Sequence, residues 1–174
     1  MKKDTKMVHN IWHHILVMSI AIIFIGGLSF CAGRWHRSSE IVGNCTDLSL
    51  SEGEAEGAAG TIYKNAVLTN DSDDTCQIIG YPAVFMQDDE GMQVGNSAVA
   101  NQLYNPTIVT LDPGEKAHTV VAFPQQGNFP AGECSGPGSS MKMYVPGLVS
   151  AVVADWSDYS CPGFSVTAIQ PGDK

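Results

Sequence analysis

The sequence predicts an all-β protein: an immunoglobulin-like antiparallel β-sandwich preceded by one hydrophobic helix at the N-terminus. An apolar stretch lies near the start of the 174-residue chain and follows a group of lysines. The remainder breaks into short segments separated by Gly, Pro, Asn and Asp, a pattern typical of sandwiches built from short strands. Four of the five cysteines lie in that remainder, an even number that suits disulfide bonds. We therefore expect two parts, residues 1–37 and an extracytoplasmic domain over residues 38–174.

The apolar stretch over residues 11–33 is predicted to cross a membrane as a helix. It contains 23 residues, and a helix needs about 20 to span a bilayer. Lys2, Lys3 and Lys6 precede it, so the N-terminus is expected to stay in the cytoplasm while the rest of the chain is exported. The membrane is thus one expected partner. The expected location is the cell membrane with an extracytoplasmic domain, or the secreted fraction.

Three fates of this leader are compatible with its residues. It is either an uncleaved signal anchor, a signal peptide cut after Gly33, or a lipoprotein leader that carries lipid on Cys31. The lipoprotein interpretation depends on Leu28-Ser29-Phe30-Cys31, in which bulky Phe30 occupies a position that favours a small residue. All three fates place residues 38–174 outside the cytoplasm.

Charge is divided unevenly between the two parts. Residues 1–37 hold five basic side chains and one acid, whereas residues 38–174 hold four basic side chains and 17 acids. An exported part this acidic repels phosphate backbones, so nucleic acid is not expected as a partner.

The four cysteines of the exported part are predicted to form two disulfides. They are Cys45, Cys76, Cys134 and Cys161. Four cysteines allow three pairings, and Cys45–Cys76 with Cys134–Cys161 is favoured because each bond joins neighbouring parts of the chain. Each loop of about 30 residues would stabilise the fold by about 3 to 4 kcal/mol. A zinc site is not favoured, since no cysteine pair has the C-x-x-C spacing and histidines are scarce.

Short strands are predicted along the whole exported part, separated by turns. Residues 51–60 are acidic and rich in glycine and are expected to be a loop, and residues 112–115 match a type II turn. The expected strands are residues 47–51, 61–69, 82–86, 107–111, 117–123, 141–145, 148–154 and 164–169.

Several of these residues together resemble a known family. They are Leu68-Thr69-Asn70, Cys76-Gln77-Ile78-Ile79-Gly80-Tyr81-Pro82, Gly91, residues 109–117 with the string Thr110-Leu111-Asp112-Pro113-Gly114, and then Cys134, Pro146 and Cys161. The chain is similar over residues 45–171 to the domain of unknown function 4232 family, which contains exported or lipid-anchored proteins, mostly of actinobacteria. The resemblance implies a β-sandwich and an extracytoplasmic location. It implies no settled activity, so no catalytic residue is carried over.

The usual sets of catalytic residues are not found in the sequence. His118 is the one histidine after residue 37, and it is expected on the surface of strand 117–123. The sequence contains no G-x-S-x-G motif, and the thiols are assigned to disulfides. We therefore expect a non-enzymatic protein with no cofactor.

Acidic turns are the remaining candidates for chemistry. Asp71, Asp73 and Asp74 could hold calcium, although they lack the full spacing of a calcium loop. The same residues, or Asp88-Asp89-Glu90, could supply the carboxylates of an envelope hydrolase. The simpler interpretation is that both groups are solvated turns.

Two further groups have a structural and a functional interpretation. Met141 and Met143 could bind copper, but their alternation favours packing in the core. Trp156 and Tyr159 could contact a ligand or cap one end of the sandwich. The sequence therefore predicts an extracytoplasmic domain that binds an envelope protein or glycan. The alternatives are an envelope hydrolase and a calcium- or copper-dependent domain.

Overall fold

A computed structural model describes residues 44–173, which form twelve strands and one short 3₁₀ helix, Gln126–Asn128. The strands are β1 (Leu48–Ala58), β2 (Thr61–Asn70), β3 (Cys76–Ile78), β4 (Ala83–Gln87), β5 (Gln93–Val94), β6 (Val99–Asn101), β7 (Val109–Leu111), β8 (Lys116–Pro124), β9 (Ser140–Tyr144), β10 (Val152–Asp155), β11 (Ser165–Thr167) and β12 (Gln170–Pro171). The predicted N-terminal helix lies outside the described residues. Residues 44–173 include no helix that is long and apolar enough to cross a membrane.

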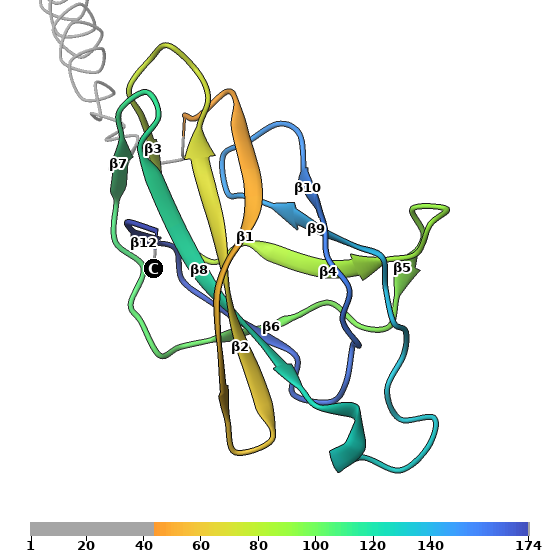
Figure 1. Cartoon of the computed structure of the whole chain (residues 1–174). Helices are drawn as coiled ribbons and strands as arrows, with labels where there is room; N and C mark the ends of the chain where they lie inside the picture. Colours follow the sequence, from red (N-terminus) through yellow and green to blue (C-terminus); the bar gives the residue numbers. More distant parts are fainter. Residues whose placement is uncertain (1–43, 174) are drawn as a thin grey trace, which may run out of the picture. The chain divides into compact units, whose positions relative to one another are not determined.

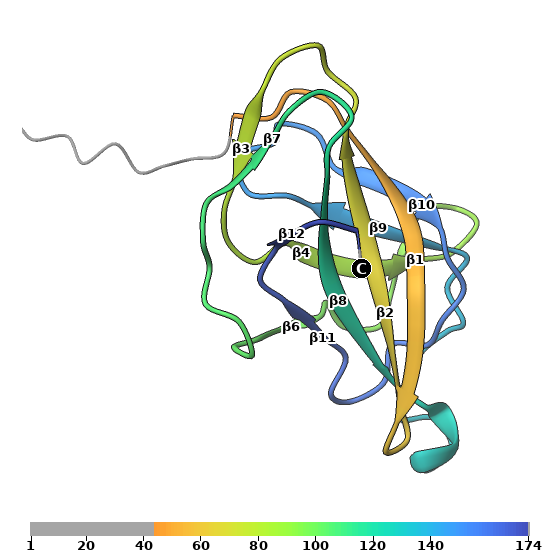
Figure 2. The ribbon, with the colours of Figure 1, turned by 60° about the vertical axis from the view of Figure 1, so that its left-hand side comes forward.

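The strands form two main sheets and a separate pair. The first sheet has the order β1-β2-β8-β11-β6, and β12 also pairs with β8. The second sheet has the order β10-β9-β4-β5, while β3 and β7 form a pair of their own. In Figures 1 and 2, β2 and β8 run along the domain and β4 crosses them at a steep angle. The all-β sandwich predicted from the sequence is confirmed. The immunoglobulin-like strand arrangement stays a prediction.

The core fills the space between the two sheets. On the second sheet, Met143 pairs with Val84 and Met141 pairs with Met86, so all four side chains share one face. All four are fully buried, as are Leu68, Val121 and Phe123 of the first sheet to within a few per cent. The predicted packing of both methionines in the core is therefore confirmed.

One pair of strands departs from the predicted antiparallel arrangement. β6 and β11 are parallel, and Val99, Ala100 and Asn101 face Ser165, Val166 and Thr167 in register. Parallel neighbours need a long crossover between them, and here the chain from β7 to β10 provides it. The expectation of a purely antiparallel sandwich was wrong at this edge.

The predicted loop at residues 51–60 was wrong as well, because β1 continues to Ala58. The turn is confined to Ala59 and Gly60, which have φ angles of 49° and 79°. Two central residues with positive φ are the mark of the two-residue hairpin turn whose twist matches the strands on either side. The acidic and small residues of β1 do not show the alternation typical of a strand, although β1 pairs with β2 from Leu48 to Ala58.

A β-bulge interrupts this hairpin. Leu50 pairs with Leu68 and Glu52 with Ala66, but Ala55 pairs with Lys64 and Glu56 with Tyr63, so β1 has one extra residue. A bulge shifts the alternation of side chains by one position. Glu52 therefore shares the inner face of the sheet with Ala66, whereas Glu56 shares the outer face with Tyr63.

Both predicted disulfides are present with the favoured pairing. Cys45–Cys76 joins the start of the described chain to β3, with the two Cα atoms 4.8 Å apart. Cys134–Cys161 joins the segment before β9 to the segment before β11, with a Cα separation of 4.2 Å. Disulfides persist in oxidising compartments. They therefore indicate an extracytoplasmic environment.

Replacing one disulfide by paired alanines should destabilise the domain substantially. The bonds close loops with sequence separations of 31 and 27 residues. The unfolded chain gains freedom when such a loop opens, so each Cys→Ala pair should lower the free energy of unfolding by about 3 to 4 kcal/mol. Denaturant unfolding of the two double variants measures this loss. A loss below about 1 kcal/mol for both would contradict a stapled fold.

Two glycines of β1 provide a test of the bulge. A Cβ added at Gly53 would lie 2.9 Å from Val67 Cγ2 and 3.1 Å from Asn65 Cβ, whereas a Cβ at Gly57 meets nothing within 4 Å. We expect Gly53→Ala to lower the free energy of unfolding by about 1 to 3 kcal/mol through overpacking. Gly57→Ala should leave stability unchanged or raise it by up to about 1 kcal/mol. Equal effects of the two variants would contradict the bulge.

Candidate functional site

A cleft on the outer face of the first sheet is a candidate functional site. Its volume is about 470 Å³, and it is lined by Glu54, Glu56, Tyr63, Asn65, Tyr104 and Val120. The lining combines two carboxylates, two aromatic rings, an amide and an apolar side chain. Clefts that bind ligands commonly combine apolar walls with a few polar groups in this way.

The local structure of the sheet directs these side chains to one face. Tyr63 and Asn65 are two residues apart on β2, so both point outward, and Val120 of β8 pairs with Asn65. The bulge sends Glu54 and Glu56 to the same face, although an unbroken strand would have turned both to the inner face. The bulge therefore adds two carboxylates to the outer face.

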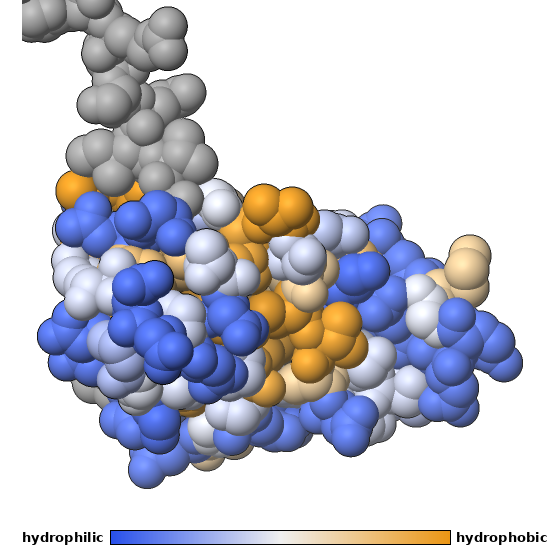
Figure 3. All heavy atoms as spheres, turned by 90° about the horizontal axis from the view of Figure 1, so that it is seen from above, coloured by the Kyte–Doolittle hydropathy of each residue, from blue (hydrophilic) through white to orange (hydrophobic). Residues whose placement is uncertain are grey.

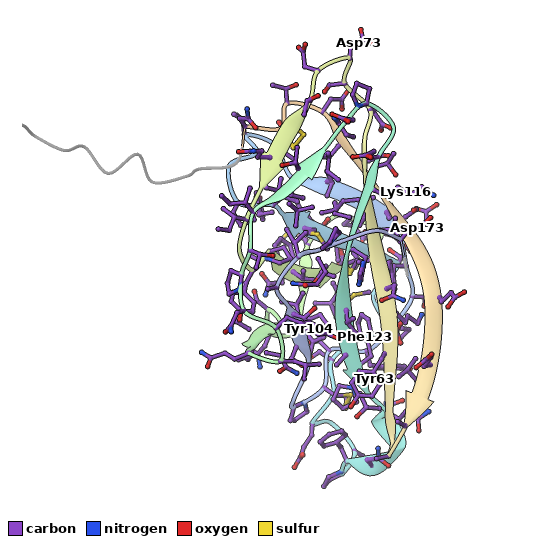
Figure 4. The ribbon with its side chains drawn as sticks, turned by 90° about the vertical axis from the view of Figure 1, so that its left-hand side faces the viewer. Tyr63, Asp73, Tyr104, Lys116, Phe123 and Asp173 are labelled. Carbon is purple, nitrogen blue, oxygen red and sulfur yellow. A yellow bond between two sulfur atoms is a disulfide. The ribbon has the colours of Figure 1, made fainter. Side chains whose placement is uncertain are left out.

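Tyr104 enters from outside the sheet. It belongs to the connection between β6 and β7, and its carbonyl oxygen accepts a hydrogen bond from the Tyr81 hydroxyl at 2.9 Å. Tyr63 and Tyr104 are each 39% exposed. Figure 4 shows both tyrosines in the same part of the domain, and Asp73 at the opposite end. The hydrogen bond from Tyr81 thus holds the β6–β7 connection at Tyr104.

A cluster around Lys64 lies on the other side of the same sheet. Its Nζ is 2.7 Å from Asp158 Oδ2 and 2.9 Å from Glu52 Oε1, and the side chain is only 15% exposed. The ammonium also lies 5.4 Å from the centre of the Trp156 ring. The Trp156 indole donates to Asp158 Oδ2 at 3.2 Å. The cluster fastens β1 and β2 to the segment after β10.

The electrostatic balance at Lys64 favours the charged ammonium. Burial alone would lower its pKa, but hydrogen bonds to Asp158 and Glu52 and the charges of both carboxylates outweigh it. The pKa of Lys64 is therefore raised above its ordinary value of 10.5. The cation is thus a structural element of the inner face and is not available to a ligand in the outer cleft.

The acidic turn predicted as a calcium candidate is organised by its neighbour Asn70. The Asn70 amide donates to the carbonyl oxygens of Asp74 at 2.9 Å and Leu111 at 3.1 Å. Its Oδ1 accepts from the Ser72 hydroxyl at 2.7 Å. Asp71, Asp73 and Asp74 are exposed, and no group of three metal-ligating side chains occurs within the described part of the chain. The calcium alternative stays a prediction.

The second acidic group also has a structural part in a turn. Asp88 Oδ1 accepts hydrogen bonds from the backbone of Glu90 at 3.1 Å and of Met92 at 2.8 Å. This turn lies between β4 and β5, whereas Asp71–Asp74 lie between β2 and β3, and the two turns stand apart in Figure 1. The two acidic groups are therefore not brought together, and the hydrolase alternative stays a prediction.

Two other sequence expectations are resolved by burial. His118 was expected on the surface but is 5% exposed; β12 pairs with β8 alongside it, and Gly172 O lies 3.0 Å from its Nδ1. Trp156 is 2% exposed and lies 6.3 Å from Phe123, ring centre to ring centre. Trp156 thus belongs to the core, and Tyr159, three residues later, is half-buried.

Sequence reasoning missed the residues of the cleft. Tyr63 was assigned to a strand, and Glu54 and Glu56 were assigned to a loop. Alternation along residues 61–69 could have placed Tyr63 and Asn65 on one face. No comparable pattern in the sequence marks the bulge that brings Glu54 and Glu56 to the same face.

Two apolar side chains are exposed at and before β10. Val149, between β9 and β10, is fully exposed, and Val153 of β10 is 51% exposed. Figure 3, which shows the domain from above, has apolar residues gathered among hydrophilic ones.

Fold and site together define a disulfide-linked β-sandwich domain with a solvent-open cleft on one sheet. The chain belongs to the family of the domain of unknown function DUF4232, whose family model matches residues 45–170. This membership confirms the resemblance found in the sequence. The chain matches no curated protein.

Replacing Lys64 should destabilise the domain because it leaves two carboxylates without their partner. For a pair of this burial we expect Lys64→Met to lower the free energy of unfolding by about 2 kcal/mol, between the values for exposed and buried ion pairs. Lys116→Met is the matched control, since its pair with Asp173 is exposed on both sides. Equal losses in the two variants, measured by denaturant unfolding, would contradict a structural role of the cluster.

The contribution of Lys64 should also depend on pH. A raised pKa in the folded state means that the stabilisation is complete below pH about 10.5 and declines as pH rises through the folded pKa. The gap in melting temperature between wild type and Lys64→Met should therefore narrow between pH 9 and about 11.5. The gap serves as the readout because tyrosine ionisation affects both proteins alike.

Proposed function

We propose that this protein is a non-enzymatic binding module of the cell envelope, with residues 1–37 as its membrane anchor or export leader. The outer-face cleft is the observation that carries this proposal. Tyr63, Glu54 and Glu56 stand on the sheet, and Tyr104 faces them from the connection between β6 and β7; neither disulfide lines the cleft. Rigid sheet faces hold binding groups in place before the ligand arrives.

The surroundings of the cleft favour binding over catalysis. Glu54 and Glu56 are exposed to water, whereas a general acid needs a carboxyl shielded from water. His118, the one histidine among the described residues, is buried and does not line the cleft. These observations support a module that recognises its ligand without transforming it. The ligand is an envelope protein or a glycan.

Site-specific photo-crosslinking in native cells tests this function. A benzoylphenylalanine placed at position 63 or 104 should yield adducts with an envelope component, because both side chains line the cleft. The same probe at Thr46, which is exposed but outside the cleft, serves as the matched control. Adduct masses then show whether the ligand is protein or glycan.

The outcome is decided by where the adducts form. Adducts at positions 63 and 104 that are missing at position 46 support the proposal. Equal adducts at all three positions, or none at positions 63 and 104, would overturn it.

A further inference from the structure

The cleft has the chemistry of a site for a cation. We propose that it binds a lysine or arginine side chain from an extended basic segment of an envelope protein. This inference rests on the proposed function and names the chemical class of its ligand.

The charges of the domain support a cationic ligand first. The described part of the chain holds 16 acidic residues and three lysines, Lys64, Lys116 and Lys142. Lys64 is held between Glu52 and Asp158 on the inner face, and Lys116 pairs with Asp173. None of the three lines the cleft. The potential there is consequently negative, and it attracts positive ligands while repelling anions.

Lys142 is committed to a different surface. It lies 5.6 Å from the ring centre of Tyr144 on the second sheet, which shows the same pairing of cation and tyrosine that we propose for the cleft. Within residues 44–173, neither Glu54 nor Glu56 forms an ion pair. Two carboxylates without a protein cation are thus left for a ligand.

The two tyrosines add a second attraction for the same ligand. The face of an aromatic ring attracts an ammonium or guanidinium within about 6 Å. Tyr63 and Tyr104 present their rings at the cleft together with the carboxylates. A neutral glycan could stack on these rings and donate its hydroxyls to the carboxylates, but only a cation also gains the attraction between opposite charges. The lining therefore favours a cation over a neutral sugar.

The place of the cleft in the sheet favours a peptide over a free amine. β1 forms the edge of the first sheet, and its only strand neighbour among the described residues is β2. Beyond the bulge, residues Ala55 to Ala58 are all exposed. An extended peptide that adds to such an edge gains main-chain hydrogen bonds, and its alternate side chains reach the adjoining surface. A basic side chain of that peptide would then meet Glu54 and Glu56.

Fluorescence anisotropy with a labelled tetralysine peptide tests the inference on the full-length protein in non-ionic detergent. Glu54→Gln combined with Glu56→Gln should weaken binding about tenfold, since each carboxylate contributes about threefold. Glu90→Gln combined with Glu133→Gln removes the same charge from two exposed sites outside the cleft. This control should change binding by less than about twofold. Tyr63→Leu should weaken binding about threefold by removing the aromatic face.

Each alternative outcome has a distinct meaning. Equal weakening by both double variants would show that only net charge matters and would overturn the inference. The inference would also be overturned if tetralysine did not bind. It would be overturned as well if a neutral N-acetylglucosamine tetramer displaced tetralysine and the two glutamates were not needed for binding. If the N-acetylglucosamine tetramer displaces tetralysine and crosslinks at position 63 persist, the proposed function stands with a glycan as ligand. If the crosslinks are also missing, both proposals fail.

Discussion

One extra residue in β1 decides which face of the large sheet receives each glutamate of the series Glu52, Glu54 and Glu56. Their spacing of two residues would place all three on the inner face of an unbroken strand. The bulge leaves Glu52 inside, where Lys64 neutralises it, and moves the other two outside. On the inner face, the single cation Lys64 pairs with Glu52 and Asp158. On the outer face, Glu54 and Glu56 line the cleft. Core and candidate site depend on the same irregularity.

The rest of the fold makes that irregularity rigid. Lys64 ties the hairpin to Asp158 and lies over Trp156, while β8 pairs with β2 along the hairpin's full length. At the far end, Asn70 links the turn after β2 to β7, and the Cys45–Cys76 bond closes the same region. Groups held on both sides lose little freedom when a ligand binds. Rigid support of this kind is typical of domains that recognise ligands on an exposed sheet.

Much of the fold follows from the sequence, because alternation and turn residues report local structure. The predicted strand at residues 117–123 corresponds to β8, and Pro113 and Gly114 mark a turn in which Gly114 has a φ of 78°. The disulfide pairing also followed from the position of the cysteines. The parallel β6–β11 pair and the burial of His118 did not, since both depend on strands that are distant in the sequence and pair side by side in the sheet. The cleft was missed for the same reason, because no local pattern marks the bulge that shapes it.

The register of the β1–β2 hairpin is the most direct test of this account. Cross-strand nuclear Overhauser effects in the isotopically labelled full-length protein report which backbone protons face each other. The account predicts that Ala55 faces Lys64 and that Glu56 faces Tyr63, beyond a segment in which Glu52 faces Ala66. An unbroken register, in which Glu54 faces Lys64 and Ala55 faces Tyr63, would contradict it. Such a register would return Glu54 and Glu56 to the inner face and remove the cleft.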